Sequence, residues 1–409
     1  MKSTECPQTA VDSVKSADEA EIEVAGTPNT GELIARSEGR CPVGANTKIE
    51  WCDFTFNPWR GCQKVAPGCA NCYAEAQSKR NPKTLGIWGP SGTRVVASEA
   101  TWREPVKWNK AAAILPDAIV RPGSLPVEYV PVGRPRVFCA SLADVFEDWQ
   151  GPMKDASGHP LHHAKAWGMP GVWAGVANTF IGRSLVKLDD VRARLFRLID
   201  ATPNLDWLLL TKRPENIRRM VHDSWTEKVP GHVSQNDGDG RRWKRRENVW
   251  LGTSIACQED AERNVPELLK CRDLCAKLFV SIEPLVGPVD ISSWVGCFHE
   301  STDPNQNDHS ECAATANWMI VGGESGPNAR PCDIAWIRSI VRQCKDAGVP
   351  VFVKQLGAKP TEYIVTAVGK DVYGNVDDDG RYEVVDLRDP KGGDPSEWPE
   401  DLRVREVPS

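Results

Sequence analysis

Seven short apolar runs recur along the chain, and the spacing between successive runs leaves room for helices. The runs occupy residues 54–56, 137–140, 207–210, 249–252, 278–281, 318–321 and 351–353. Near-continuous apolar strands of this length are typical of a parallel sheet that is buried on both faces. Strands that alternate with amphipathic helices indicate βα units. We therefore expect an α/β fold: a partial or complete parallel (β/α) TIM-like barrel.

Two stretches show a helix pattern clearly. Apolar side chains over residues 184–201 recur every three or four positions, which is the period of an amphipathic helix. Asp333 suits the N-cap of a second helix, and Gly348 followed by Pro350 suits its end. Both helices fall between predicted strands, as βα units require.

The ends of the chain differ from its middle in composition. Residues 1–45 are rich in Ser, Thr, Glu, Ala and Gly without periodicity, which predicts a disordered tail. The barrel is expected over 46–360, and the polar residues 361–409 are expected to form an extended C-terminal arm. The side chains expected to pack this arm on the body are Tyr363, Tyr382 and Trp398.

Charge and composition exclude several protein classes. The formal net charge of -6 gives no overall basic signature for nucleic acid, and a local basic groove remains compatible with it. No stretch reaches 18 consecutive apolar residues, and the first residues lack the apolar core of a signal peptide. We therefore expect a cytoplasmic protein without a membrane span, whose 14 cysteines are reduced. Most of the 16 Trp are expected in the core.

Polar side chains follow the apolar runs where each predicted strand ends. In parallel βα folds the catalytic and binding residues lie at the carboxyl ends of the strands, so these side chains are expected on one rim. The candidates are Ser141, Lys212, Arg213, Ser254, Glu283 and Glu324. The basic members suit a carboxylate or phosphate, or are solvated charges, and the acidic members suit polar ligands or buried ion pairs.

Three cysteines, Cys62, Cys69 and Cys72, lie within eleven positions after the first run. They are compatible with a [4Fe–4S] cluster that has one open iron, or with zinc and a fourth ligand such as Cys52. Unligated thiols are the third alternative. No second Cys or His pair follows closely, as zinc ribbons usually require, so we predict the cluster.

Three cysteines after a first strand, followed by βα units, resemble the radical S-adenosylmethionine superfamily. The spacing here is Cys-x6-Cys-x2-Cys, where the superfamily usually has Cys-x3-Cys-x2-Cys. The resemblance implies that the open iron binds the amino and carboxylate groups of S-adenosylmethionine, whose reductive cleavage yields a 5′-deoxyadenosyl radical that abstracts a hydrogen atom.

Several separated motifs also resemble a three-cysteine-motif family of phage and prophage proteins, whose fold is regarded as radical-enzyme-like. The similarity covers roughly residues 46–360 and 398–403. The motifs are residues 47–51, 57–58, 211–215, 249–254, 283–288, 322–327 and 354–355. The activity of that family is largely unassigned, so the resemblance predicts the architecture and does not identify the substrate.

Together these features predict a cluster-dependent radical enzyme. Lys212 or Arg213 is expected to neutralise the cofactor carboxylate, while Ser141, Ser254, Glu283 and Glu324 are candidates for its amino group and ribose. Cys139 and Cys257 are candidates for returning a hydrogen atom to a substrate radical, or are small buried thiols. The alternative is a non-catalytic, zinc-stabilised protein that binds nucleic acid or another partner.

For the substrate we expect a nucleic acid or nucleotide, in keeping with the phage resemblance. Residues 241–246 offer five cations around Trp243, a composition that suits phosphates and a stacked base and also suits a solvated loop. A possible second metal site, or alternatively a disordered insertion, comprises Cys297, His299, His309 and Cys312.

Overall fold

The structure, a computed structural model, describes residues 47–115, 118–120, 129–131, 133–162, 185–228, 241–296, 315–370 and 376–408. The predicted tail over residues 1–45 and the four residues of the possible second metal site lie outside these ranges. Within the described helices, none is long and apolar enough to cross a membrane.

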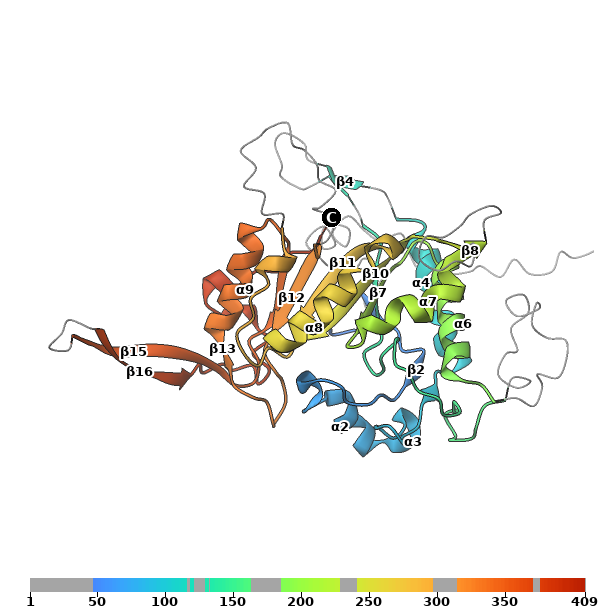
Figure 1. The fold of residues 1–409 in the computed structure, drawn as a ribbon, viewed down its shortest axis with the longest axis horizontal. Helices are drawn as coiled ribbons and strands as arrows, with labels where there is room; N and C mark the ends of the chain where they lie inside the picture. Colours follow the sequence, from blue (N-terminus) through green and yellow to red (C-terminus); the bar gives the residue numbers. More distant parts are fainter. Residues whose placement is uncertain are drawn as a thin grey trace, which may run out of the picture.

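All seven predicted strands are present and form one parallel sheet (Figure 1). In sheet order they are β1 (Phe54–Thr55), β6 (Arg136–Cys139), β7 (Asp206–Thr211), β10 (Arg246–Ile255), β11 (Cys275–Ile282), β12 (Trp318–Gly322) and β14 (Val351–Gln355). This order is also their order along the chain, as in a TIM barrel. Among the described residues β14 does not pair with β1. The sheet is therefore a curled half-barrel, and the prediction of a partial barrel is confirmed at this level.

Helices follow the strands and pack on the sheet (Figure 1). The main ones are α4 (Glu99–Ala112), α6 (Leu188–Asp200), α7 (Ile217–Trp225), α8 (Gln258–Leu269) and α9 (Ile334–Asp346). The helix predicted over 184–201 starts at Leu188 because the Lys187 backbone N–H donates to Asp190 and fixes the N-cap there. Asp333 caps α9 by accepting from Ala335 N at 2.9 Å, as predicted.

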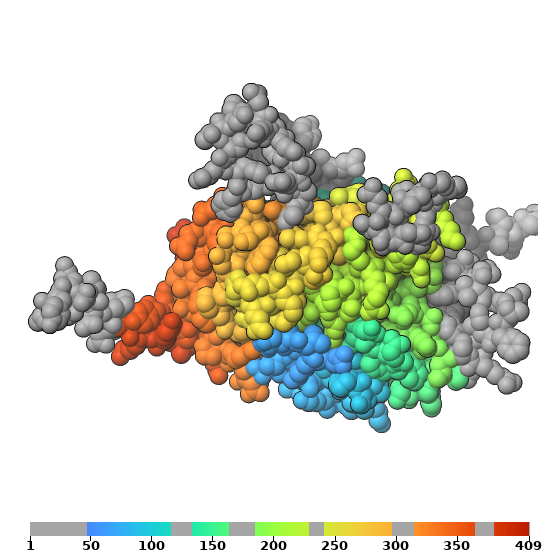
Figure 2. All heavy atoms as spheres, viewed as in Figure 1, coloured from blue at the N-terminus to red at the C-terminus, as the bar shows by residue number. Residues whose placement is uncertain are grey.

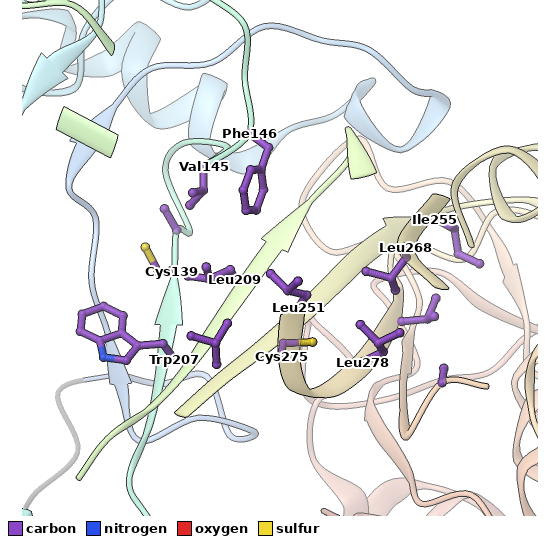
Figure 3. Close-up of a cluster of buried hydrophobic side chains, with 14 of the residues drawn as sticks. Cys139, Val145, Phe146, Trp207, Leu209, Leu251, Ile255, Leu268, Cys275 and Leu278 are labelled. Carbon is purple, nitrogen blue, oxygen red and sulfur yellow. The ribbon is translucent and has the colours of Figure 1, made fainter. Parts of the chain in front are cut away.

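The two faces of the sheet bury different layers. Figure 3 shows part of the larger layer, in which strand residues meet the helices. The second layer is smaller and aromatic, and Trp318 is at its centre, with ring centroids 5.9 Å from Trp250 and 6.2 Å from Trp51. Much of the tryptophan content is thus core, because Trp51, Trp59, Trp207, Trp225, Trp318 and Trp398 are all fully buried.

The C-terminal arm has two parts. β15 (Pro360–Lys370) and β16 (Val376–Val384) form a hairpin that projects from the body (Figures 1 and 2). The prediction that Tyr363 and Tyr382 pack on the body is wrong. Their rings contact each other across the hairpin, with centroids 5.2 Å apart, and they are 40% and 61% exposed. Trp398 is buried as expected.

Residues after the hairpin return to the sheet. Val353 N donates to Val404 O at 2.8 Å, and Glu406 N donates to Val351 O at 3.0 Å, so this segment runs along β14. Arg405 also forms a 2.8 Å ion pair with Glu50, which precedes β1. Segments from both ends of the described chain therefore meet where a complete barrel would be closed by strand pairing.

Candidate active site

A cavity of about 950 Å³ opens at the carboxyl ends of the strands. It is lined by residues that follow β6, β7, β11 and β12, by the last residues of β10 and β14, and by the cysteine loop. The predicted site residues that line it are Cys62, Cys69, Cys72, Ser141, Lys212, Arg213, Ser254 and Glu283. Its position is where parallel βα folds place their chemistry, so the predicted shared rim is present.

The cysteine loop leaves β2 (Trp59–Arg60) at Gly61 and ends at Cys72, the N-cap of α2 (Tyr73–Arg80). Gly61 has φ +111°, and a Cβ there would lie 2.3 Å from Thr93 O, so only glycine fits the turn. At the tip of the loop, a Cβ on Gly68 would lie 3.2 Å from Ala256 Cβ. The loop therefore packs directly on the rim of the half-barrel.

Glu324, which follows β12, is tied to the loop through Asn71 and Arg330. It accepts from Arg330 Nε at 2.9 Å and Nη2 at 2.8 Å, and from Asn71 Nδ2 at 3.0 Å. Arg330 also donates to Pro67 O at 3.1 Å. Burial acts to raise the pKa of Glu324, but the hydrogen bonds from Arg330 outweigh it and hold the pKa below its ordinary value. Glu324 is not among the residues that line the cavity, and these bonds tie it to the loop. Its contact with the cofactor stays a prediction.

Glu324→Gln tests this role. Gln keeps the volume but loses the charge-assisted bonds to Arg330, at a cost of about 1–2 kcal/mol in loop ordering. We expect roughly tenfold faster amide hydrogen exchange over residues 61–73, measured by mass spectrometry, with exchange in α9 unchanged. Unchanged exchange in the loop would show that Glu324 does not hold it.

Arg213, which follows β7, contacts the cysteine loop at Cys62 and Gln63. Its Nη1 lies 2.6 Å from Asp144 Oδ2, its Nη2 donates to Gln63 O at 3.0 Å, and Cys62 Sγ is 3.8 Å from Nη1. Burial, reinforced by nearby Glu147 and Asp144, raises the pKa of Cys62 to about 12, with Arg213 opposing the rise. Because Arg213 is buried and bound to Asp144, it is committed to the loop rather than to a cofactor carboxylate.

Lys212 is placed differently. Its ammonium contacts the Ser254 hydroxyl, which donates to Glu283 O at 3.0 Å. Glu283 forms a 2.9 Å ion pair with Lys354, so the ion-pair alternative considered for Glu283 is the one observed. The Lys212 backbone N–H donates to Asp144 Oδ2 at 3.1 Å. Within the described part of the chain its ammonium has no carboxylate partner, which leaves that charge available to an anionic group in the cavity.

Ser141 lies at the end of β6 beside the loop. Its hydroxyl accepts from Asn57 Nδ2 at 3.0 Å, and its carbonyl accepts from the Tyr73 hydroxyl at 2.6 Å. The sequence offered no signal for the contact between Ser141 and Tyr73, or for the role of Asn71, because these partners are far apart in the chain or hidden between the cysteines.

The two proposed hydrogen donors are not among the residues that line the cavity. Cys139 is fully buried among Val145, Phe146 and Leu209 in the larger core layer (Figure 3), and burial raises its pKa above the ordinary range for a thiol. Cys257 is the N-cap residue of α8. The alternative of a small buried thiol therefore describes Cys139, whereas hydrogen donation by the half-buried Cys257 stays a prediction.

The three loop thiols face one cavity without forming a compact ligand set. Among the described residues, no three His, Cys, Asp or Glu side chains are grouped to hold one metal ion. Zinc needs its ligand atoms around one point, whereas an iron–sulfur cluster takes each thiolate on a different iron. Cys52 is packed in the aromatic core layer and does not line the cavity, so it is not placed as a fourth zinc ligand. Three thiols without a fourth cysteine in the lining are the number of donors that a cluster with one open iron needs.

The basic run over residues 241–246 lies elsewhere. β9 (Arg241–Trp243) pairs with β8 (Thr226–Lys228), and Arg246 begins β10, at the opposite end of the sheet from the cavity. Arg242 pairs with Glu227, and Arg218 stacks 4.6 Å above the Trp243 ring. The run does not line the cavity, so it gives no support for a nucleic-acid substrate there.

Comparisons with known proteins give a family but no activity. Neither the curated proteins nor the solved structures contain a match. A family described as protein of unknown function (DUF5131) matches residues 46–152 and 166–385, which include the cysteine loop and all seven strands of the parallel sheet. The chain therefore belongs to the DUF5131 family.

Proposed function

We propose that this protein is a radical S-adenosylmethionine-type enzyme whose Cys62, Cys69 and Cys72 hold a [4Fe–4S] cluster. The observation that supports this most is that all three thiols and Lys212 line one cavity at the carboxyl edge of a half-barrel. When bound, the cluster and S-adenosylmethionine would supply a radical able to abstract a hydrogen atom.

Different side chains around the cavity would bind the cofactor and hold the cysteine loop. Lys212 offers its ammonium to the cofactor carboxylate, and Ser254 fixes that ammonium in place. Glu324 and Arg213 hold the cysteine loop against the rim from two sides. Ser141 lines the cavity beside the loop, and its hydroxyl is offered to a polar group of the cofactor.

A zinc-stabilised binding protein is the second candidate. It would use the same three cysteines, and the ligand spacing in the sequence allows it. Cys52 is packed in the aromatic core layer and does not line the cavity, so the fourth ligand that zinc needs is missing from the lining.

Reductive cleavage of S-adenosylmethionine tests the proposal. Anaerobically reconstituted protein, reduced with dithionite, is expected to release 5′-deoxyadenosine, measured by chromatography. Lys212→Met is expected to raise the concentration of S-adenosylmethionine needed by about tenfold, because one charge-assisted contact is lost. A protein with a full cluster that releases no 5′-deoxyadenosine would contradict the enzymatic proposal.

A further inference from the structure

Most charged side chains that line the cavity are already neutralised. Their partners are carboxylates or cations within or just outside the cavity. The pairs are Arg213–Asp144 at 2.6 Å, Lys354–Glu283 at 2.9 Å, Lys64–Glu75 at 2.9 Å and Glu50–Arg405 at 2.8 Å. These groups hold the walls of the cavity, and their charges are not free for a ligand.

Three lysines in the lining are different. Across the described residues, Lys48, Lys212 and Lys391 have no carboxylate within ion-pair distance, although all three line the cavity. Asp389 is the one lining carboxylate outside the ion pairs of the described chain, and it accepts backbone N–H groups from Gly393 and Lys391. The cavity thus has an excess of positive charge in a chain whose net charge is -6.

The lysines come from separate parts of the chain. Lys48 precedes the first strand, Lys212 follows β7, and Lys391 lies in the segment that returns to the sheet after the hairpin. Lys48 and Lys391 are exposed, while Lys212 is half-buried. Since Lys212 is assigned to the cofactor carboxylate, two cations remain at the cavity. Cations of one sign lining a cleft concentrate its field and attract anions.

Aromatic side chains line the same cavity. Tyr73 is 54% exposed although it is anchored through its hydroxyl to Ser141 O. Trp88 is half-buried. A fixed, partly exposed ring offers a face on which a planar group can stack, and every nucleobase has such a face.

We infer that the cavity binds a substrate that joins a planar base to a phosphate, with Lys48 and Lys391 contacting the phosphate and Tyr73 or Trp88 contacting the base. This inference rests on the proposed function in taking the cavity as the active site. The shared chemistry is a nucleoside phosphate, whose source is a free nucleotide or the 5′-phosphorylated end of an oligonucleotide.

Calorimetric binding of four probes to the full chain tests the inference. The probes are thymidine, thymidine monophosphate, and a short oligothymidylate with and without a 5′-phosphate. One exposed charge pair is worth about 1 kcal/mol, or roughly fivefold in affinity, so a phosphate preference of at least about fivefold is expected. Whichever phosphorylated probe binds more tightly identifies the source.

Lys48→Gln and Lys391→Gln are each expected to weaken binding of the phosphorylated probe about fivefold and to leave thymidine binding unchanged. Lys345→Gln is the matched control: it removes the same charge from an exposed lysine on α9, outside the cavity, and should change nothing. Equal binding with and without phosphate, or lysine variants that match this control, would overturn the inference.

Iron content, measured on the same preparations, separates this inference from the proposed function. A phosphate preference in protein that acquires no iron would support the inference and contradict the cluster. A full cluster with cleavage of S-adenosylmethionine, but with no phosphate preference, would contradict the inference alone.

Discussion

Cys69→Ala is expected to reduce the iron bound after anaerobic reconstitution from about four atoms per chain to less than one. Cys69 ends the short helix Pro67–Cys69 at the centre of the loop, and its thiol lines the cavity with those of Cys62 and Cys72. Two remaining thiolates cannot hold a cluster that uses three. The measurement is iron and acid-labile sulfide per chain.

The fold should survive this change. Cys69 is only half-buried and belongs to neither core layer, so far-ultraviolet circular dichroism and the unfolding midpoint of the metal-free protein are expected to stay close to wild type. Cys257→Ala is the matched control, because this half-buried thiol lies outside the cavity lining and should retain full iron. Equal iron loss in both variants would contradict the assignment of ligands.

Arg94→Met is expected to lower the free energy of unfolding by about 3–5 kcal/mol. Arg94 and Glu147 are both fully buried and joined by two hydrogen bonds, at 2.6 and 2.7 Å. Glu147 is also 3.6 Å from Arg213, the residue that supports Cys62. Removal of Arg94 leaves a buried carboxylate with one longer contact, and urea unfolding of the metal-free chain measures the loss.

Two variants make that test specific. Arg338→Met removes a partly exposed arginine that pairs with Glu362 and Asp401, and is expected to cost about 1 kcal/mol or less. Combining Arg94→Met with Glu147→Gln removes the uncompensated charge and is expected to recover part of the loss. A loss below about 1 kcal/mol for Arg94→Met alone would show that the buried pair does not hold this region.

The sheet was predictable because its signal is local. Each strand is a short apolar run buried on both faces, so burial is visible in four or five consecutive residues, as in Trp207–Leu210 of β7. Strand ends in parallel folds share one edge, and this rule brought Lys212, Ser254 and the three cysteines to one cavity without any knowledge of their contacts.

The individual roles were not predictable, because they depend on partners distant in the chain. The position of Glu324 after a strand predicts a ligand-binding carboxylate. Its oxygens instead accept hydrogen bonds from Arg330 and from Asn71, which is 253 positions away. Arg213 is likewise taken by Asp144 and Gln63. Lys391 lies in a polar stretch without periodicity, and only the return of that segment to the sheet brings it to the cavity.

Metal analysis of the protein purified without oxygen separates a cluster from zinc. We expect a brown protein with about four iron atoms and four sulfides per chain, whose colour is bleached by dithionite. A colourless protein that carries about one zinc ion, contains no sulfide and is unaffected by dithionite would contradict the cluster.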